Sequence, residues 1–135
     1  MIYFDTNVLI YATVNQDDGK RLLSQDKIRD AERNKRLLIS PLSIQEFSFV
    51  LRKLSIPDDA IFQKASFFLN FCHHNIDCTL LAEACELASI ANSYQSINDT
   101  IHLKFAERYA RKLVTFDSDF KRFARFTTID LEILK

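Results

Sequence analysis

Four acidic residues stand in or directly after apolar segments that are far apart in the sequence. Asp5 follows MIYF, Glu46 lies in SPLSIQEF, Asp99 lies in SINDTIHL, and Asp117 lies in KLVTFDSDF. Carboxylates gathered in one pocket repel each other, and a divalent cation is the usual means of neutralising them. If the fold brings the four together, they are candidate ligands for such a cation.

The spacing of apolar residues predicts short strands that alternate with longer helices. Runs typical of buried parallel strands occur at 1–4, 37–40, 112–116 and 127–129, with a weaker candidate at 75–78. Helical spacing occurs at 18–35, 42–54, 57–72, 79–94 and 98–112. Strands alternating with helices predict a parallel sheet that is covered on both faces.

Ligands of such sheets bind beyond the carboxyl ends of the strands. Asp5 and Asp117 each follow a predicted strand directly, so we expect both at the same edge. Each acid also has a simpler interpretation. Asp5 and Asp99 could cap helices, and Glu46, on an apolar helix stripe, could form a buried ion pair. Asp119 is the more natural cap for the next short helix, which leaves Asp117 without a local structural role.

Composition limits the class of protein. The chain has 135 residues, of which 47% are hydrophobic and 27% charged, so it can bury a core as a soluble protein of one domain. The opening MIYFDTNVLIYA has no basic segment before it and contains Asp5, which predicts neither a signal peptide nor a membrane span, and hence a cytoplasmic protein. Gly19 is the only glycine, which excludes a glycine-rich phosphate loop.

The four acidic segments together resemble the PIN-domain nuclease family. IYFDTNVLI at 2–10 is similar to its opening signature, and PLSIQEF, SINDTIHLKFA and LVTFDSDF follow in the family's order. The resemblance covers nearly the whole chain. It implies a single PIN-like domain over residues 1–135, with a three-layer α/β/α fold around a mainly parallel central sheet.

The resemblance also implies a site. The metal-binding catalytic acids would be Asp5, Glu46, Asp99 and Asp117, holding Mg²⁺ or Mn²⁺. Their supporting residues would be Thr6, Asn7, Ser43, Thr115 and Asp119. His102 departs from the small or apolar residue more typical after the third acid, and the sequence suggests no role for it.

Short members of this family are commonly VapC-like toxin ribonucleases of toxin–antitoxin pairs. The resemblance therefore implies a metal-dependent endoribonuclease with an RNA substrate, a cognate antitoxin and a homodimeric state. The chain has 18 acidic and 18 basic residues, so its net charge does not indicate RNA binding. Any RNA-binding surface must come from a local group of basic residues. The candidates, which could equally be an ordinary solvated helix face, are Lys104, Arg108, Arg111, Lys121 and Arg122. Apolar residues spread around the helices at 42–54 and 57–72 suggest a groove for the antitoxin.

Two alternatives remain open. A non-catalytic PIN scaffold could hold RNA or protein without cutting, although four clustered carboxylates would then only cost stability. A phosphatase-type enzyme on a doubly wound sheet is the other alternative. It is disfavoured because the second Asp expected two residues beyond Asp5 is Asn7.

Overall fold

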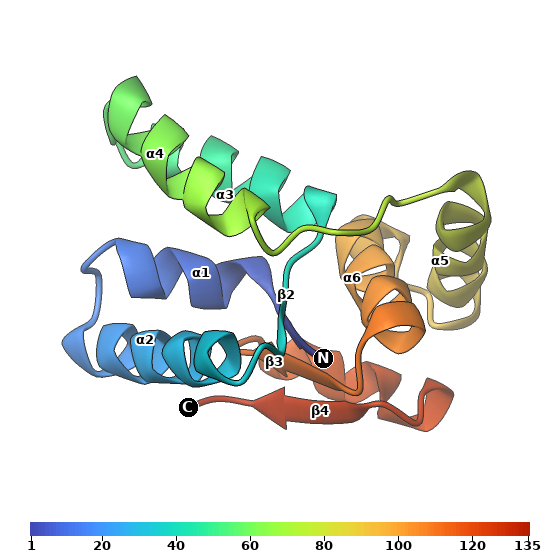
Figure 1. Cartoon of the computed structure of the whole chain (residues 1–135). Coiled ribbons are helices and arrows are strands. Elements are labelled where there is room, and N and C mark those ends of the chain that lie inside the picture. The colour runs from blue at the N-terminus through green and yellow to red at the C-terminus, as the bar shows by residue number, and fades with distance from the viewer.

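A computed structural model describes residues 1–135 of the chain (Figure 1). The strands are β1 (Ile2–Phe4), β2 (Leu37–Leu38), β3 (Lys112–Thr115) and β4 (Asp130–Ile133). They form one sheet in the order β2-β1-β3-β4, and all three pairings are parallel. The helices are α1 (Thr6–Thr13), α2 (Asp18–Arg33), α3 (Pro41–Lys53), α4 (Asp58–Leu69), α5 (Cys78–Ile90) and α6 (Ile97–Tyr109), with 3₁₀ turns η1 (Tyr94–Ser96) and η2 (Ser118–Phe126).

Alternating side chains on the strands divide the core into two layers. Tyr3 and Leu113 point to the face covered by α5, α6 and η2, whereas Phe4 and Val114 point to the face covered by α1 to α4. Figure 1 shows α5 and α6 on one side and α1 and α2 on the other. All four strand residues are 0–1% exposed, as expected for a sheet buried on both faces. The predicted three-layer α/β/α fold is confirmed.

Two of the strand predictions were wrong: one strand lies further along the chain, and the other does not form. The run at 127–129 precedes the fourth strand, which pairs with β3 only from Asp130 onward. The candidate at 75–78 forms no strand, because the Asp77 side chain accepts a hydrogen bond from the Leu80 backbone N–H at 2.8 Å and so begins α5. No helix has the length and apolar character that crossing a membrane would require.

Candidate active site

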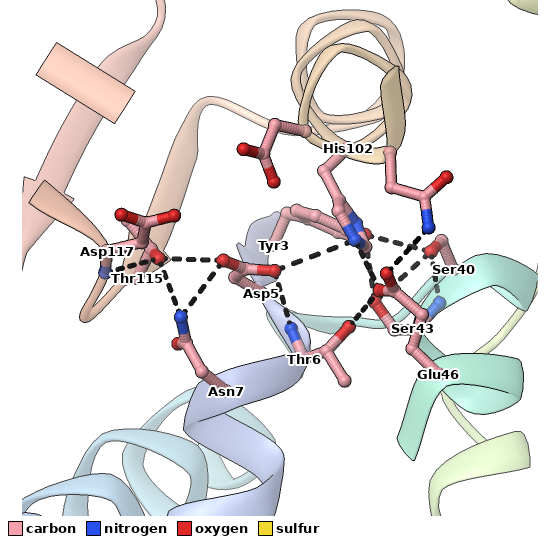
Figure 2. Close-up of polar contacts among 12 residues, drawn as sticks. Tyr3, Asp5, Thr6, Asn7, Ser40, Ser43, Glu46, His102, Thr115 and Asp117 are labelled. Atoms are coloured by element: carbon pink, nitrogen blue, oxygen red, sulfur yellow. Dashed lines mark hydrogen bonds and ion pairs between the residues drawn. The ribbon is translucent and has the colours of Figure 1, made fainter. Parts of the chain in front are cut away.

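The acids predicted from the sequence gather at the carboxyl edge of the sheet (Figure 2). Asp5 directly follows β1, and Asp117 follows β3 after one intervening residue; these two strands are paired neighbours. Glu46 reaches this edge from α3, and Asp99 from the first turn of α6. Four elements that are distant in sequence therefore contribute one carboxylate each.

Asp5 is buried and accepts three hydrogen bonds. Its Oδ1 accepts the backbone N–H of Thr6 at 2.7 Å, which makes it the N-cap of α1. Its Oδ2 accepts the hydroxyl of Thr115 at 2.7 Å and the amide of Asn7 at 3.3 Å. Asp5 is therefore the N-cap that its simpler interpretation predicted, and the same side chain lies at the candidate site.

Asn7 and Thr115 join α1 to the end of β3. The Asn7 amide donates to Thr115 Oγ1 at 3.2 Å, and its carbonyl oxygen accepts the backbone N–H of Phe116 at 3.2 Å. Thr115 Oγ1 also accepts the backbone N–H of Asp117 at 3.0 Å. These bonds fix the positions of Asp5 and Asp117 relative to each other.

The prediction that Asp119, rather than Asp117, caps the short helix after β3 was wrong. Asp117 caps η2 and accepts the backbone N–H of Asp119 at 2.9 Å. The reason is local: η2 begins at Ser118, so Asp117 is the residue that occupies the cap position. The Asp119 side chain is 72% exposed and lies 4.0 Å from Arg122 Nη1.

Glu46 receives three donors. Its Oε1 accepts the Thr6 hydroxyl at 2.6 Å and contacts His102 Nε2 at 2.7 Å, and its Oε2 accepts the Asn98 amide at 2.9 Å. The simpler interpretation of Glu46, a partly buried ion pair, is therefore realised with His102. Ser43 hydrogen-bonds to Tyr3 and Ser40 rather than to any of the four acids.

His102 is the residue that sequence reasoning missed. Its side chain is 2% exposed, and its Nδ1 hydrogen-bonds to the Tyr3 hydroxyl. That hydroxyl also bonds to Ser40 at 2.8 Å and to Ser43 at 2.9 Å. One signal was available, because residues three apart on a helix share a face and His102 stands three after Asp99.

Asp99 has a raised pKa. Burial, together with the charges of Asp5 and Asp117, raises it to about 6, although the charges of His102 and Arg122 act to lower it. Arg122 Nη2 donates to Asp99 Oδ2 at 3.0 Å, so this carboxylate carries an internal counter-charge.

The pKa changes of Asp5, Glu46 and His102 are caused mainly by burial and by the contacts that involve His102. Burial raises the pKa of Asp5 despite the nearby His102 charge and the Thr115 hydrogen bond. Burial alone would also raise the pKa of Glu46, but the hydrogen bond and charge of His102, with the Thr6 hydrogen bond, lower it to about 2. Burial would lower the pKa of His102, yet Asp5 and Glu46 raise it. The Glu46–His102 ion pair is thus favoured on both sides.

Comparison with known families gives a match to the family described as "PIN domain", which extends over residues 2–126. The chain belongs to the PIN-domain family. The matched range includes all four acids of the edge cluster. PIN domains are generally nucleases, so the PIN domain is assigned to this broad class of hydrolases.

A solved structure supports the same fold. A chain in the "Crystal structure of VapBC2 from Rickettsia felis bound to a DNA fragment from their promoter" superposes with a TM-score of 0.72, at 22% sequence identity and over 100% of both chains. At this identity the similarity establishes the fold of the PIN domain alone. No curated protein matches its sequence significantly.

The basic residues expected to bind RNA are divided between two ends of the PIN domain. Lys121 and Arg122 lie on η2, directly after Asp117, and Lys121 is exposed. Arg111 does not join them, because it precedes β3 and so lies at the amino edge of the sheet. There it lines an open hollow of about 510 Å³ together with Arg36.

The other two basic candidates, like Arg122, form ion pairs within the chain. Lys104 pairs with Glu107 at 3.0 Å. Arg108 pairs with Asp77 at 3.1 Å and with Glu83 at 2.9 Å, near the far end of α6. Their charges are therefore largely compensated within the chain.

The donor chemistry of the edge fits a hard divalent cation, because Asp5, Asp99 and Asp117 offer only oxygen ligands. The raised pKa of Asp99 indicates negative charge that such a cation would relieve. As the side chains stand, no three His, Cys, Asp or Glu side chains converge closely enough to hold a metal ion. In this arrangement Arg122 pairs with Asp99 and His102 pairs with Glu46.

Proposed function

We propose that this PIN domain is a metal-dependent endoribonuclease and the toxin of a toxin–antitoxin pair. The observation that carries the proposal is that Asp5, Glu46, Asp99 and Asp117 come to one sheet edge from four separate parts of the chain, close enough that the charges of Asp5 and Asp117 raise the pKa of Asp99. The general activity of PIN domains supports the chemistry. The similarity to a chain of a VapBC2 structure supports the biological class. An RNA substrate implies a cytoplasmic location.

In this proposal the edge acids hold Mg²⁺ or Mn²⁺. A bound divalent cation would lower the pKa of a water molecule and neutralise charge on the scissile phosphate. The chain contributes the orientation of the acids: Thr115 and Asn7 hold Asp5 through its Oδ2. Lys121 and Arg122, next to the acids, would hold the phosphate backbone without reading bases.

The direct test uses purified protein and end-labelled structured RNA with Mn²⁺. We expect cleavage that a chelator abolishes and that Asp99→Asn or Asp5→Asn reduces by several orders of magnitude, with the fold retained. Glu86→Gln is the matched control, because Glu86 is an exposed acid on α5 outside the cluster. Cleavage by purified Asp99→Asn at the parent rate would show that the acids do not form the active site.

We further propose that α3 and α4 bind the antitoxin and a second copy of the chain. Phe49 is 65%, Phe62 74% and Phe67 44% exposed, an unusual amount of aromatic surface for two adjacent helices. An open hollow of about 380 Å³ is lined by residues of both helices, including Phe62. An amphipathic helix fits a surface of this kind.

Phe62→Ser should therefore weaken dimerisation and binding of the protein encoded beside this one. Leu22→Ser is the control, because Leu22 is 54% exposed on α2. Sedimentation velocity measures the first effect and titration calorimetry the second. If Phe62→Ser changes neither, or if the parent chain is monomeric and binds nothing, this surface is not an interface.

A second candidate function, a non-catalytic scaffold that binds RNA or protein, is favoured by one observation. His102 and Arg122 contact three of the four acids and supply up to two positive charges against four negative ones, so the chain itself offsets part of the charge that a metal would otherwise neutralise. The two functions differ in one measurement. A scaffold would retain labelled RNA intact in a mobility-shift assay with Mn²⁺, whereas the nuclease would shorten it.

A further inference from the structure

The space between Asp5 and Glu46 is occupied by a side chain of the PIN domain itself. His102 Nε2 lies 2.7 Å from Glu46 Oε1 and 3.6 Å from Asp5 Oδ1. A cation that bridges Glu46 Oε1 and Asp5 Oδ1 would compete with this ring nitrogen for the space between the two oxygens. Figure 2 shows the ring of His102 between the two acids.

His102 is held in that position from behind. Its Nδ1 contacts the hydroxyl of Tyr3, which is 0% exposed. Ser40 and Ser43 bond to the same hydroxyl at 2.8 and 2.9 Å, and to each other at 3.2 Å. All the side chains in this series of hydrogen bonds are buried. The imidazole therefore cannot turn away without leaving polar groups unpaired.

Glu46 also accepts hydrogen bonds from two residues other than His102. Thr6 donates to its Oε1 at 2.6 Å from α1, and Asn98 donates to its Oε2 at 2.9 Å from α6. Asp99 and Asp117 face a different situation. Neither is bound by His102, and the guanidinium that Asp99 contacts belongs to Arg122, whose side chain is 32% exposed. Exchange of that partly exposed group is far easier than exchange of a buried ring.

We propose that His102 is a positioning residue that keeps Glu46 out of the metal's ligand set, so that Asp5, Asp99 and Asp117 alone hold the cation. Glu46 then serves as an outer acid that ties Thr6 of α1 and Asn98 of α6 to the site. This inference rests on the proposed metal-dependent function, and it revises the role expected for Glu46 from the family resemblance.

The test is calorimetric titration of Mn²⁺ into each purified protein, without RNA. Glu46→Gln, which removes an outer acid, should lower the Mn²⁺ affinity by about tenfold, whereas Asp99→Asn, which removes a direct ligand, should lower it by at least about a hundredfold. His102→Ala should tighten Mn²⁺ binding by about tenfold, because Glu46 becomes free to ligate, and this gain should vanish in His102→Ala/Glu46→Gln. A merely structural role of His102 would not produce a gain that depends on Glu46.

Further variants protect the test against unfolding, which circular dichroism would reveal. Tyr3→Phe keeps the ring packing and removes only the hydroxyl that holds His102, so it should move Mn²⁺ affinity in the same direction as His102→Ala. His102→Gln keeps an N–H donor near Glu46 and should restore the parent affinity.

Two results would overturn the proposal. In the first, Glu46→Gln loses as much Mn²⁺ affinity as Asp99→Asn; in the second, neither His102→Ala nor Tyr3→Phe gains affinity. Failure of the proposed function is separable from both. A parent chain that binds no Mn²⁺ contradicts the metal-dependent nuclease, while Glu46-dependent Mn²⁺ binding that appears in His102→Ala would still support the positioning role. Absence of binding in both proteins would refute the positioning role as well.

Discussion

Neutralising Asp99 should stabilise the metal-free PIN domain. Its pKa is raised from 3.8 to about 6, so the folded protein holds this proton more tightly than the unfolded chain does. Folding therefore carries no penalty from Asp99 below about pH 3.8, and the full penalty once the pH exceeds about 6. Asp99→Asn removes the charge at nearly constant volume and with it the penalty.

The size of the effect can be worked from the same values. A difference of about two pH units corresponds to an upper bound of about 3 kcal/mol. The Asp99 side chain is 24% exposed, and solvent screening lowers the expected gain to about 1–2 kcal/mol. For a domain of this length, that gain corresponds to a rise in melting temperature of about 3–8 °C. This free-energy gain already includes the loss of the contact with Arg122, because that contact is one of the influences that set the pKa of Asp99.

The assay is thermal or urea unfolding of the parent, Asp99→Asn and the control Glu86→Gln, all with chelator, at pH 4 and pH 8. The gain should be present at pH 8 and nearly absent at pH 4, where the parent carboxylate is largely protonated. An Asp99→Asn protein that is no more stable than Glu86→Gln at pH 8 would refute the reasoning. So would a gain of equal size at both pH values.

Two further predictions concern the same edge. Mn²⁺ added to chelator-treated parent protein should raise its melting temperature, because binding to the folded state alone stabilises it. Asp5→Asn should show little of this rise in differential scanning fluorimetry, and an equal rise in both proteins would place the ion elsewhere. Thr115→Val should cost about 1–3 kcal/mol in urea unfolding, because it leaves Asp5 Oδ2 and the Asp117 backbone N–H without their shared hydroxyl partner. An unchanged midpoint would mean that water replaces the hydroxyl.

The sequence was sufficient to predict the positions of those site residues that depend only on strand topology. Asp5 and Asp117 follow apolar runs, and parallel pairing alone brings the ends of such strands together. The same rule could not place the fourth strand, because its start depends on where it meets β3. The register begins at Asp130 rather than within the apolar run before it.

Side-chain partners across elements were beyond a reading of the sequence. The contact between His102 and Glu46 joins residues 56 apart and depends on how α6 and α3 approach the sheet edge. The Asp99–Arg122 pair likewise depends on the path of η2. Both contacts supply positive charge to the acids, so a count of carboxylates alone overstated the charge that a metal must neutralise.

The order of the strands also has a consequence for synthesis on the ribosome. β3 lies inside the sheet between β1 and β4, yet it is translated long after β1, and the bond from Thr115 to Asp5 spans 110 positions. The emerging polypeptide therefore carries an exposed, unpaired edge on β1 until β3 arrives, which slows folding and invites association with other chains. During this interval Asp5 has neither its Thr115 donor nor Asp117 beside it. The candidate site is therefore incomplete until translation has passed β3.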